Sequence, residues 1–240
     1  MRIVSTVPSQ TELLYDLGLE KEVVGITKFC IHPDSWFRSK KRIGGTKNLN
    51  IEKIIDLKPD LIIANKEENT KEEIEILQQH SEVFVSEIKT IEDNYQLIKE
   101  IGKLTQKEEK ANRLISETQT ALDFTPTHQN KTVVYLIWKK PFMTIGSDTF
   151  INSMLEKCGF INMYANQTRY PQTTIEEIVN LKPQYVLLSS EPYPFKEKHI
   201  LELQNVVPDC KIILADGEAF SWYGSRIIKK SKYLKNMSLL

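Results

Sequence analysis

Short apolar runs alternate with longer amphipathic segments along most of the chain, which is the pattern of strands and helices that follow one another. In residues 1–90 this pattern predicts strands at 3–7, 23–26, 61–64 and 83–85 and helices at 51–57 and 71–79. A further helix should start at the Ser-Gln-Thr-Glu sequence of residues 9–12, which has the form of a capping box, and should end at Gly18. Short buried strands between helices predict a parallel sheet with both faces covered.

The middle of the chain is predicted to be helical. One helix is expected at 91–103, and a second at 107–124 carries its apolar residues on one stripe and ends before Pro126. At about 1.5 Å per residue the second helix spans roughly 27 Å, which is long enough to connect two lobes.

The alternation of strands and helices resumes after residue 126. Strands are predicted at 133–138, 185–189 and 212–215, and helices at 149–158, 175–181 and 225–236. Residues 175–185 repeat the pattern of residues 51–61, a helix followed by Leu-Lys-Pro and a strand, 124 positions later. A unit repeated in each half predicts two similar lobes. The expected division is an N-terminal α/β lobe at 1–90, a helical segment with the linking helix at 91–126, and a C-terminal α/β lobe at 127–240.

Composition narrows the classes of function. The 240 residues contain 32 Lys and Arg and 32 Asp and Glu, without a basic run interleaved with aromatic residues, so we expect no nucleic-acid partner. The three cysteines, Cys30, Cys158 and Cys210, are odd in number and far apart, which favours reduced thiols over a disulfide framework. Cys158 and Cys210 are expected to fill the cores.

The N-terminal sequence predicts where the protein works. A strand begins directly after Met1 and Arg2, so neither a secretory leader nor a membrane-crossing stretch is expected. The initiating Met1 favours the cytoplasm, whereas a mature form trimmed of its leader would act in the periplasm.

A cysteine and a histidine stand two residues apart after the strand at 23–26. On a loop at a strand end, Cys30 and His32 can point the same way and ligate a soft or borderline metal. The alternative is a buried cysteine beside a surface histidine.

Three further segments follow strands or precede a helix and offer ligand contacts. Residues 66–69 are charged or carry an amide, and they either hydrogen-bond a polar ligand or are merely solvated. Residues 191–195 contain two prolines that fix their aromatic rings, which either stack on a flat ligand or pack Phe195 inside its own lobe. Residues 220–226 are rich in aromatic side chains and lead into the last helix, where backbone N–H groups and Arg226 could receive an anion.

Motifs of the common enzyme classes are missing from the sequence. It has no glycine-rich phosphate loop, no Gly-x-Ser-x-Gly elbow and no His-Glu-x-x-His pair. His80, His128 and His199 lie in polar surroundings and are expected at the surface. Since no nucleophile is paired with a base, we expect no catalytic residue and no required cofactor.

Several motifs together resemble one known family. They are Ser-Thr-Val-Pro-Ser-Gln-Thr-Glu at 5–12, Gly-Gly-Thr at 44–46, both Leu-Lys-Pro units and Ile-Gly-Ser-Asp-Thr at 145–149. Their order and spacing are similar to those of the class III, or helical-backbone, substrate-binding proteins, and most of all to the cobalamin-binding type. Members bind cobalamin, haem or iron chelates and usually deliver them to ABC importers. The resemblance implies an α/β fold of two Rossmann-like lobes with parallel sheets, joined by one long backbone helix, with the ligand in the cleft between the lobes.

The resemblance and the chemistry of the loops together name the candidate ligand contacts. In the first lobe they are Phe29, Cys30, His32, Thr46, Lys47, Asn48, Glu67, Glu68 and Asn69, and in the second lobe Phe142, Tyr170, Tyr193, Glu218, Ser221, Trp222, Tyr223 and Arg226. In a corrinoid complex the imidazole of His32 could take the place of the lower axial ligand of cobalt. Thr46 and Asn65 stand where cobalamin binders often carry tryptophan, which leaves iron and haem chelates open as ligands beside corrinoids.

The family docks to its importer through one acidic residue on the outer face of each lobe. Glu52 and Glu176 match these residues at equivalent places of the internal repeat. The alternative is that both acids only stabilise the first turn of their helices.

The sequence thus predicts a non-catalytic binding protein that clamps a corrinoid or a metal chelate for ABC-type uptake or intracellular handling. Two alternatives stay open. One is a cytosolic corrinoid or metal carrier, or a sensor, that signals to a protein partner. The other is an enzyme that acts on a cofactor bound in the cleft.

Overall fold

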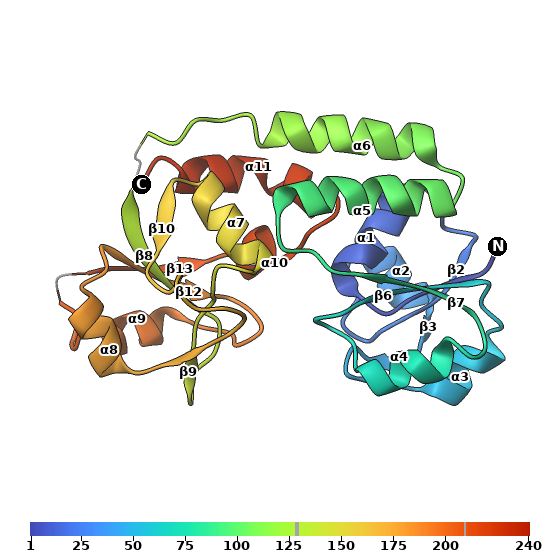
Figure 1. Cartoon of the computed structure of the whole chain (residues 1–240), viewed down its shortest axis with the longest axis horizontal. Coiled ribbons are helices and arrows are strands. Elements are labelled where there is room, and N and C mark those ends of the chain that lie inside the picture. Colours follow the sequence, from blue (N-terminus) through green and yellow to red (C-terminus); the bar gives the residue numbers. More distant parts are fainter. Residues whose placement is uncertain (128–129, 209) are drawn as a thin grey trace. The chain divides into compact units, whose positions relative to one another are not determined.

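The computed structural model describes residues 1–127, 130–208 and 210–240, which form two compact units (Figure 1). Unit 1 consists of Met1–Ile88, Glu92–Gln119 and Tyr223–Ile228, and unit 2 of Lys89–Ile91, Thr120–Trp222 and Lys229–Leu240. Each unit has its own parallel sheet covered by helices, so the predicted two-lobed α/β fold is confirmed. The boundaries at residues 90 and 126, and the linking role of the long helix, stay predictions.

Unit 1 is built on a five-stranded parallel sheet with the order β3-β2-β1-β6-β7. Its strands are β1 (Ile3–Ser5), β2 (Val23–Ile26), β3 (Lys41–Arg42), β6 (Leu61–Asn65) and β7 (Glu82–Ser86). The N-terminal strand β1 pairs with both β2 and β6 and is therefore central. A small antiparallel pair, β4 (Gly44–Gly45) and β5 (Asn48–Leu49), follows β3.

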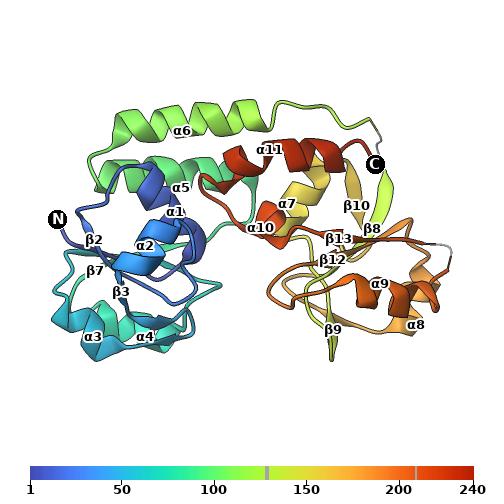
Figure 2. The same ribbon diagram turned by 180° about the vertical axis from the view of Figure 1, so that it is seen from behind.

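Helices cover both faces of the unit 1 sheet. The helices of unit 1 are α1 (Pro8–Asp16), α2 (Asp34–Ser39), α3 (Ile51–Asp56), α4 (Lys71–Leu77), α5 (Ile91–Leu104) and α6 (Glu108–Ala121), of which α6 packs on α5. Figure 1 and Figure 2 show α3 and α4 on one face of the unit 1 sheet and α1 and α5 on the other. On the first face, Ile54 and Ile74 share one apolar cluster with Ile62 of β6.

Unit 2 has a four-stranded parallel sheet with the order β10-β8-β12-β13. Its strands are β8 (Lys131–Leu136), β10 (Phe160–Asn162), β12 (Tyr185–Ser189) and β13 (Lys211–Ala215). The strands β9 (Phe142–Met143) and β11 (Gln172–Thr173) form a separate antiparallel ribbon. Along the chain they lie between strands of the four-stranded sheet.

The helices of unit 2 are α7 (Phe150–Lys157), α8 (Ile175–Leu181), α9 (Glu197–Gln204), α10 (Gly217–Ser221) and most of α11 (Arg226–Met237). Ile178 of α8 and Leu203 of α9 belong to one buried cluster with Val186 of β12. On α10, Phe220 contacts Tyr135 of β8 edge to face, with ring centroids 5.5 Å apart. Apolar burial of this kind is the main favourable term that holds such layers together.

The internal repeat of the sequence recurs as a repeat of structure. Helix α3 leads into β6 and helix α8 into β12, and both helices carry a side-chain cap. The caps are equivalent: Asn50 accepts a hydrogen bond from the backbone of Lys53, and Thr174 accepts one from the backbone of Glu177. Both units therefore use the same local devices to start the helix that precedes a central strand.

Some expectations about helices were wrong. The Ser-Gln-Thr-Glu sequence is not a capping box, because α1 begins at Pro8, has Val7 as its N-cap and receives no side-chain cap. Proline fits the first position of a helix, so Ser9 and Glu12 lie inside the helix instead of capping it. The helix expected at 107–124 is shorter, with 14 residues from Glu108 to Ala121.

The cysteines behave as the sequence predicted. Cys30, Cys158 and Cys210 are all free and buried. No helix in the described parts of the chain combines the length and the apolar character needed to cross a membrane.

Candidate functional site

The parallel sheet of unit 1 brings the loops after several of its strands to one carboxyl edge. Phe29, which follows β2, is 50% exposed, and its ring lies against Gly45 of β4. Nδ2 of Asn69 donates to the carbonyl of Thr46 over 2.9 Å. The structure therefore brings the loops of Phe29, Thr46 and Asn69 together. Two further candidates are exposed beside Thr46: Lys47 and Asn48.

The loop at 65–69 is held in place from within. Asn65 Oδ1 accepts from the backbone N–H groups of Glu67 and Glu68, at 2.8 and 3.2 Å. Asn69 Oδ1 accepts from Thr6 Oγ1 at 2.8 Å and from the backbone of Asn65 at 2.9 Å. The two asparagines thus fix the backbone, and the partly exposed side chains of Glu67 and Glu68 are what the loop presents.

Cys30 is set in the core of unit 1. Thr11 Oγ1 donates to Cys30 Sγ at 3.0 Å, and Thr27 Oγ1 lies 3.2 Å from it. Burial raises the pKa of the Cys30 thiol to about 11, so the thiolate needed for a metal bond is scarce at neutral pH. His32 is partly exposed, which agrees with the alternative of a buried cysteine beside a surface histidine. Among the described residues, no group of three His, Cys, Asp or Glu side chains is arranged to hold a metal ion.

Residues 223–225 belong to unit 1, although they lie far along the chain from the rest of that unit. Each donates to an acceptor of that unit: Tyr223 Oη to Glu68 Oε1 at 3.3 Å, the backbone of Gly224 to Asn94 Oδ1, and Ser225 Oγ to Asp16 Oδ2. Gly224 has φ 86°, and a Cβ there would lie 3.3 Å from the carbonyl oxygen of Ser9 in α1. The positive φ therefore favours glycine here, and the close approach to α1 adds to this preference.

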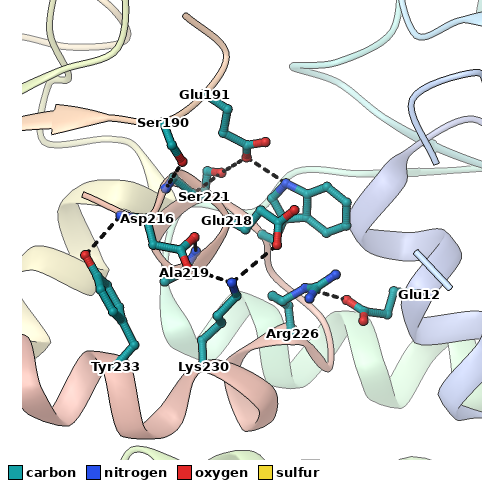
Figure 3. Close-up of polar contacts among 12 residues, drawn as sticks. Glu12, Ser190, Glu191, Asp216, Glu218, Ala219, Ser221, Arg226, Lys230 and Tyr233 are labelled. Carbon is teal, nitrogen blue, oxygen red and sulfur yellow. Dashed lines mark hydrogen bonds and ion pairs between the residues drawn. The ribbon is translucent and has the colours of Figure 1, made fainter. Parts of the chain in front are cut away.

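Arg226 forms a buried ion pair in unit 1. Its Nε lies 2.8 Å from Glu12 Oε2, and the two side chains are 8% and 4% exposed (Figure 3). The sequence suggested that Arg226 receives an anion, and in the structure that anion is the carboxylate of Glu12. Glu12 is the glutamate of the Ser-Gln-Thr-Glu sequence that resembled a capping box.

In unit 2, polar side chains gather at the carboxyl ends of β12 and β13 (Figure 3). Glu191 Oε1 accepts from Ser221 Oγ at 2.9 Å and from the indole Nε1 of Trp222 at 2.7 Å. Burial raises the pKa of Glu191, and the nearby carboxylates of Glu218 and Asp216 act in the same direction, while the two hydrogen bonds act against it.

One lysine neutralises part of this acidic cluster. Lys230 of α11 lies 2.6 Å from Asp216 Oδ2 and 3.4 Å from Glu218 Oε2. Asp216 also caps α10, since its Oδ1 accepts from the backbone of Ala219 at 3.2 Å. Of the two candidates on α10, Glu218 is ion-paired with Lys230 and Ser221 is bonded to Glu191.

Aromatic side chains gather at the carboxyl ends of β8 and β12. Trp138 is 40% exposed, and its ring meets that of Tyr193 edge to face with centroids 5.7 Å apart. Tyr193 in turn contacts Phe195, at 4.7 Å between centroids. Phe195 is buried inside unit 2, so the exposed part of this aromatic group is Trp138 with Tyr193 behind it. Trp138 was missed from the sequence, where it was assigned to the end of a strand, whereas β8 ends at Leu136.

The prediction for His199 was wrong. Its side chain is 4% exposed, and its Nδ1 accepts from the backbone of Lys196 at 2.9 Å, at the start of α9. Burial lowers the pKa of this imidazole. The short helix α9 was not recognised from the sequence, and it is what turns His199 inward. His80 is exposed as expected, and His128 lies outside the described residues.

Phe142 and Tyr170 lie on or beside the β9–β11 ribbon of unit 2. Phe142 pairs with Thr173, three residues after Tyr170, and both aromatic side chains are partly buried. The ribbon thus brings two of the second-unit candidates onto one short element.

Glu52 and Glu176 occupy equivalent positions in the two units. Each is exposed and lies in the first turn of its helix, α3 or α8. This geometry suits both readings of these acids, docking and stabilisation of the helix start.

Residues 3–205 match the model of a family described as periplasmic binding protein. An uncharacterized ABC transporter substrate-binding lipoprotein of Bacillus subtilis (strain 168), YvrC, is 32% identical over 199 residues, which cover 78% of this chain and 62% of YvrC. The vitamin B12-binding protein of Vibrio campbellii is 24% identical over 213 residues, covering 86% of this chain and 77% of that protein. The matched stretch is thus less than two thirds of YvrC.

Solved structures resemble the whole chain. One is described as a possible iron-binding (periplasmic solute-binding) protein from Staphylococcus epidermidis ATCC 12228, with a TM-score of 0.83, 28% identity and coverage of 98% of this chain and 97% of that one. The periplasmic vitamin B12 binding protein of Vibrio cholerae has a TM-score of 0.80 and 21% identity, covering 99% and 96%. At that identity the second likeness shows the fold alone.

Proposed function

Since the chain belongs to the periplasmic binding protein family, we propose that it is a non-catalytic protein that binds a corrinoid or a metal chelate and passes it to an ABC importer. A vitamin B12-binding protein and a protein described as possibly iron-binding are among its relatives, which supports these two ligand classes. A corrinoid comes first, because several curated relatives carry the name vitamin B12-binding protein.

The observation that carries the proposal is the composition of the carboxyl edge of unit 2. A partly exposed tryptophan, Trp138, is backed by Tyr193, and a second tryptophan, Trp222, is 7% exposed and held by Glu191. Aromatic rings held by packing or hydrogen bonds bind a flat macrocycle at low entropic cost.

Titration of the purified protein tests the proposal. Cobalamin and cobinamide are added first, and haemin and a ferric hydroxamate afterwards, with binding followed by calorimetry and by the absorption bands of each ligand. We expect saturable one-to-one binding of a corrinoid, weakened about tenfold or more by Trp222→Ala. Leu201→Ala is the matched control, since Leu201 is 69% exposed on α9 of the same unit. If neither corrinoid binds while a chelate does, the corrinoid assignment is wrong and the chelate takes its place.

The same membership of the family supports an importer as the partner. A relative named as an ABC transporter substrate-binding lipoprotein, and others named as periplasmic, support action outside the cytoplasm. We assign docking to Glu52 and Glu176, one exposed acid in each unit. The alternative that the sequence offered, a cytosolic carrier or sensor, would bind the ligand equally well but would not respond to a permease.

A further inference from the structure

Glu191 accepts the N–H of the Trp222 indole at 2.7 Å, which is shorter than its contact with Ser221 Oγ at 2.9 Å. Its other donor, Ser221 Oγ, is also 2.9 Å from the carbonyl of Gly217 and can donate its proton there instead. The indole N–H has one direction only, because the ring is planar and rigid. Trp222 therefore depends on Glu191 for its orientation, whereas Ser221 has a second acceptor in Gly217.

Glu191 is itself held against the start of α10. A Cβ on Gly217 would lie only 2.4 Å from Glu191 Cγ, so the two residues are packed as closely as a glycine permits. Ser189 Oγ donates to the carbonyl of Glu191 at 2.6 Å, and the backbone of Gly217 donates to Ser190 Oγ at 2.9 Å. The backbone of Glu191 is thus fixed at the carboxyl end of β12, and its side chain packs against the start of α10, which follows β13.

The charges around Glu191 affect the pKa of its carboxyl group. The groups that face it are the carboxylates of Asp216 and Glu218, and Lys230 neutralises part of their charge from α11. Burial with these acids raises the pKa of Glu191 above the ordinary value of 4.5. A protonated carboxyl is a weaker acceptor than a carboxylate, so the bond to the indole weakens as the pH falls.

We infer that Glu191 is a positioning residue, which fixes the Trp222 indole for contact with the ligand and links the affinity of the protein to its own charge. The inference rests on the proposed function only in so far as Trp222 contacts the ligand. Holding one aromatic side chain in its bound orientation changes affinity by about three- to tenfold. Affinity should therefore be highest above the pKa of Glu191 and should fall as the pH drops through it.

The hydrogen bond can be measured without any ligand, because the three tryptophans have three different surroundings. Trp36 is fully buried and its Nε1 finds no partner among the described residues, Trp138 is 40% exposed, and Trp222 is bonded to Glu191. We expect three indole N–H signals in a ¹⁵N-resolved NMR spectrum, one of which, assigned by its loss in Trp222→Phe, moves with pH at a midpoint above 4.5. In Glu191→Ala this signal should shift and stop titrating, whereas in Glu197→Gln, a control at an exposed position of α9, it should not change. An unchanged Trp222 signal in Glu191→Ala would overturn the inference, whether or not a ligand is known.

Affinity for cobalamin supplies the second arm. Glu191→Ala should weaken binding about three- to tenfold, while Glu191→Gln should keep most of the affinity and lose the pH dependence, since its amide oxygen still accepts the indole N–H. In a Trp222→Phe background, which has no N–H, Glu191→Ala should have no further effect. An equal loss in both backgrounds would mean that Glu191 touches the ligand directly, which overturns a positioning role. Failure of the wild type to bind cobalamin would remove the proposed ligand and leave the NMR result to decide on Glu191.

Discussion

Lys58 and Lys182, 124 residues apart, share the same left-handed backbone conformation, with φ of 46° and 50°. Each follows a helix, α3 or α8, and precedes a buried proline that leads into a strand. A residue with a Cβ in this conformation costs roughly 1–2 kcal/mol relative to the right-handed region. The Leu-Lys-Pro repeat of the sequence thus marks a helix end of the same strained geometry in both units.

Glycine should relieve this strain. We expect Lys182→Gly to raise the free energy of unfolding by about 0.5–1 kcal/mol, because glycine adopts positive φ without a Cβ clash while losing part of the gain to its more flexible unfolded chain. Urea unfolding followed by circular dichroism measures the change. Lys182→Ala keeps the Cβ and serves as control. An equal gain in the alanine variant would show that the side chain, and not the backbone, is the source.

The ion pair of Arg226 with Glu12 should matter for stability. Arg226→Met removes the cation and leaves a carboxylate that is 4% exposed, which we expect to cost about 3 kcal/mol or more. The double variant with Glu12→Leu should recover much of the loss, since it buries no charge. Arg38→Met breaks an exposed pair with Asp34 and should change stability by less than about 1 kcal/mol. Similar losses in the two arginine variants would contradict the assigned role of burial.

The three cysteines should react slowly in the native protein. Burial raises the pKa of Cys30 and Cys210 to about 11 and that of Cys158 to about 12, from an ordinary value of 9.0. Ellman's reagent at pH 8 should therefore label native protein far more slowly than unfolded protein. Between pH 9.0 and about 11 the folded thiols keep protons that the unfolded chain has released, so stability should fall as the pH rises through this window. Three fast thiols at pH 8 would contradict this burial.

Trp138 should contribute to ligand binding although its sequence context gave no sign of it. We expect Trp138→Ala to weaken corrinoid binding by about tenfold and Trp138→Phe by less, because phenylalanine keeps a ring against Tyr193. Calorimetric titration measures both. Equal affinities of the wild type and Trp138→Ala would show that Trp138 does not contribute to ligand binding.

The acids Glu52 and Glu176 should affect delivery and not ligand affinity. With a reconstituted permease, Glu52→Lys or Glu176→Lys should abolish the stimulation of ATP hydrolysis by the loaded protein while leaving its affinity for the ligand unchanged. Glu72→Lys is the matched control, an exposed acid in the first turn of α4. Should all three variants behave alike, both acids would only stabilise their helices.

Long apolar strands and periodic helices were predictable from the sequence. The strand β12 was placed at 185–189 because residues 185–188 form an apolar run, a pattern that needs no tertiary information. The short helices α2, α9 and α10 were missed. Six residues of α2, for example, hold one buried side chain, Trp36, and so show no helical period. Their helical form depends on packing and not on local pattern.

The candidate site was predictable by segment and not by contact. Residues 220–226 were predicted from their aromatic side chains to contact a ligand, which stays a prediction. Their partners lie far along the chain: Glu191 is 31 residues from Trp222, and Glu68 is 155 residues from Tyr223. Local composition identifies which side chains are unusual, whereas only the folded sheet order decides which acid meets which donor. The motif at 5–12 shows this most clearly, because its glutamate, Glu12, forms an ion pair with Arg226 and does not cap the start of α1.

The position of residues 223–228 in unit 1 also has a consequence for how the protein is made. Most of unit 1 is translated before unit 2, yet the last segment of unit 1 leaves the ribosome only after every strand of unit 2 has been translated. Until then Glu12 lacks its ion pair with Arg226, and Asn94 lacks the backbone of Gly224. Unit 1 is therefore the first to be started and among the last parts to be finished. A fragment that ends at residue 119 is an unfinished unit, so the two units cannot be separated by a single cut of the chain.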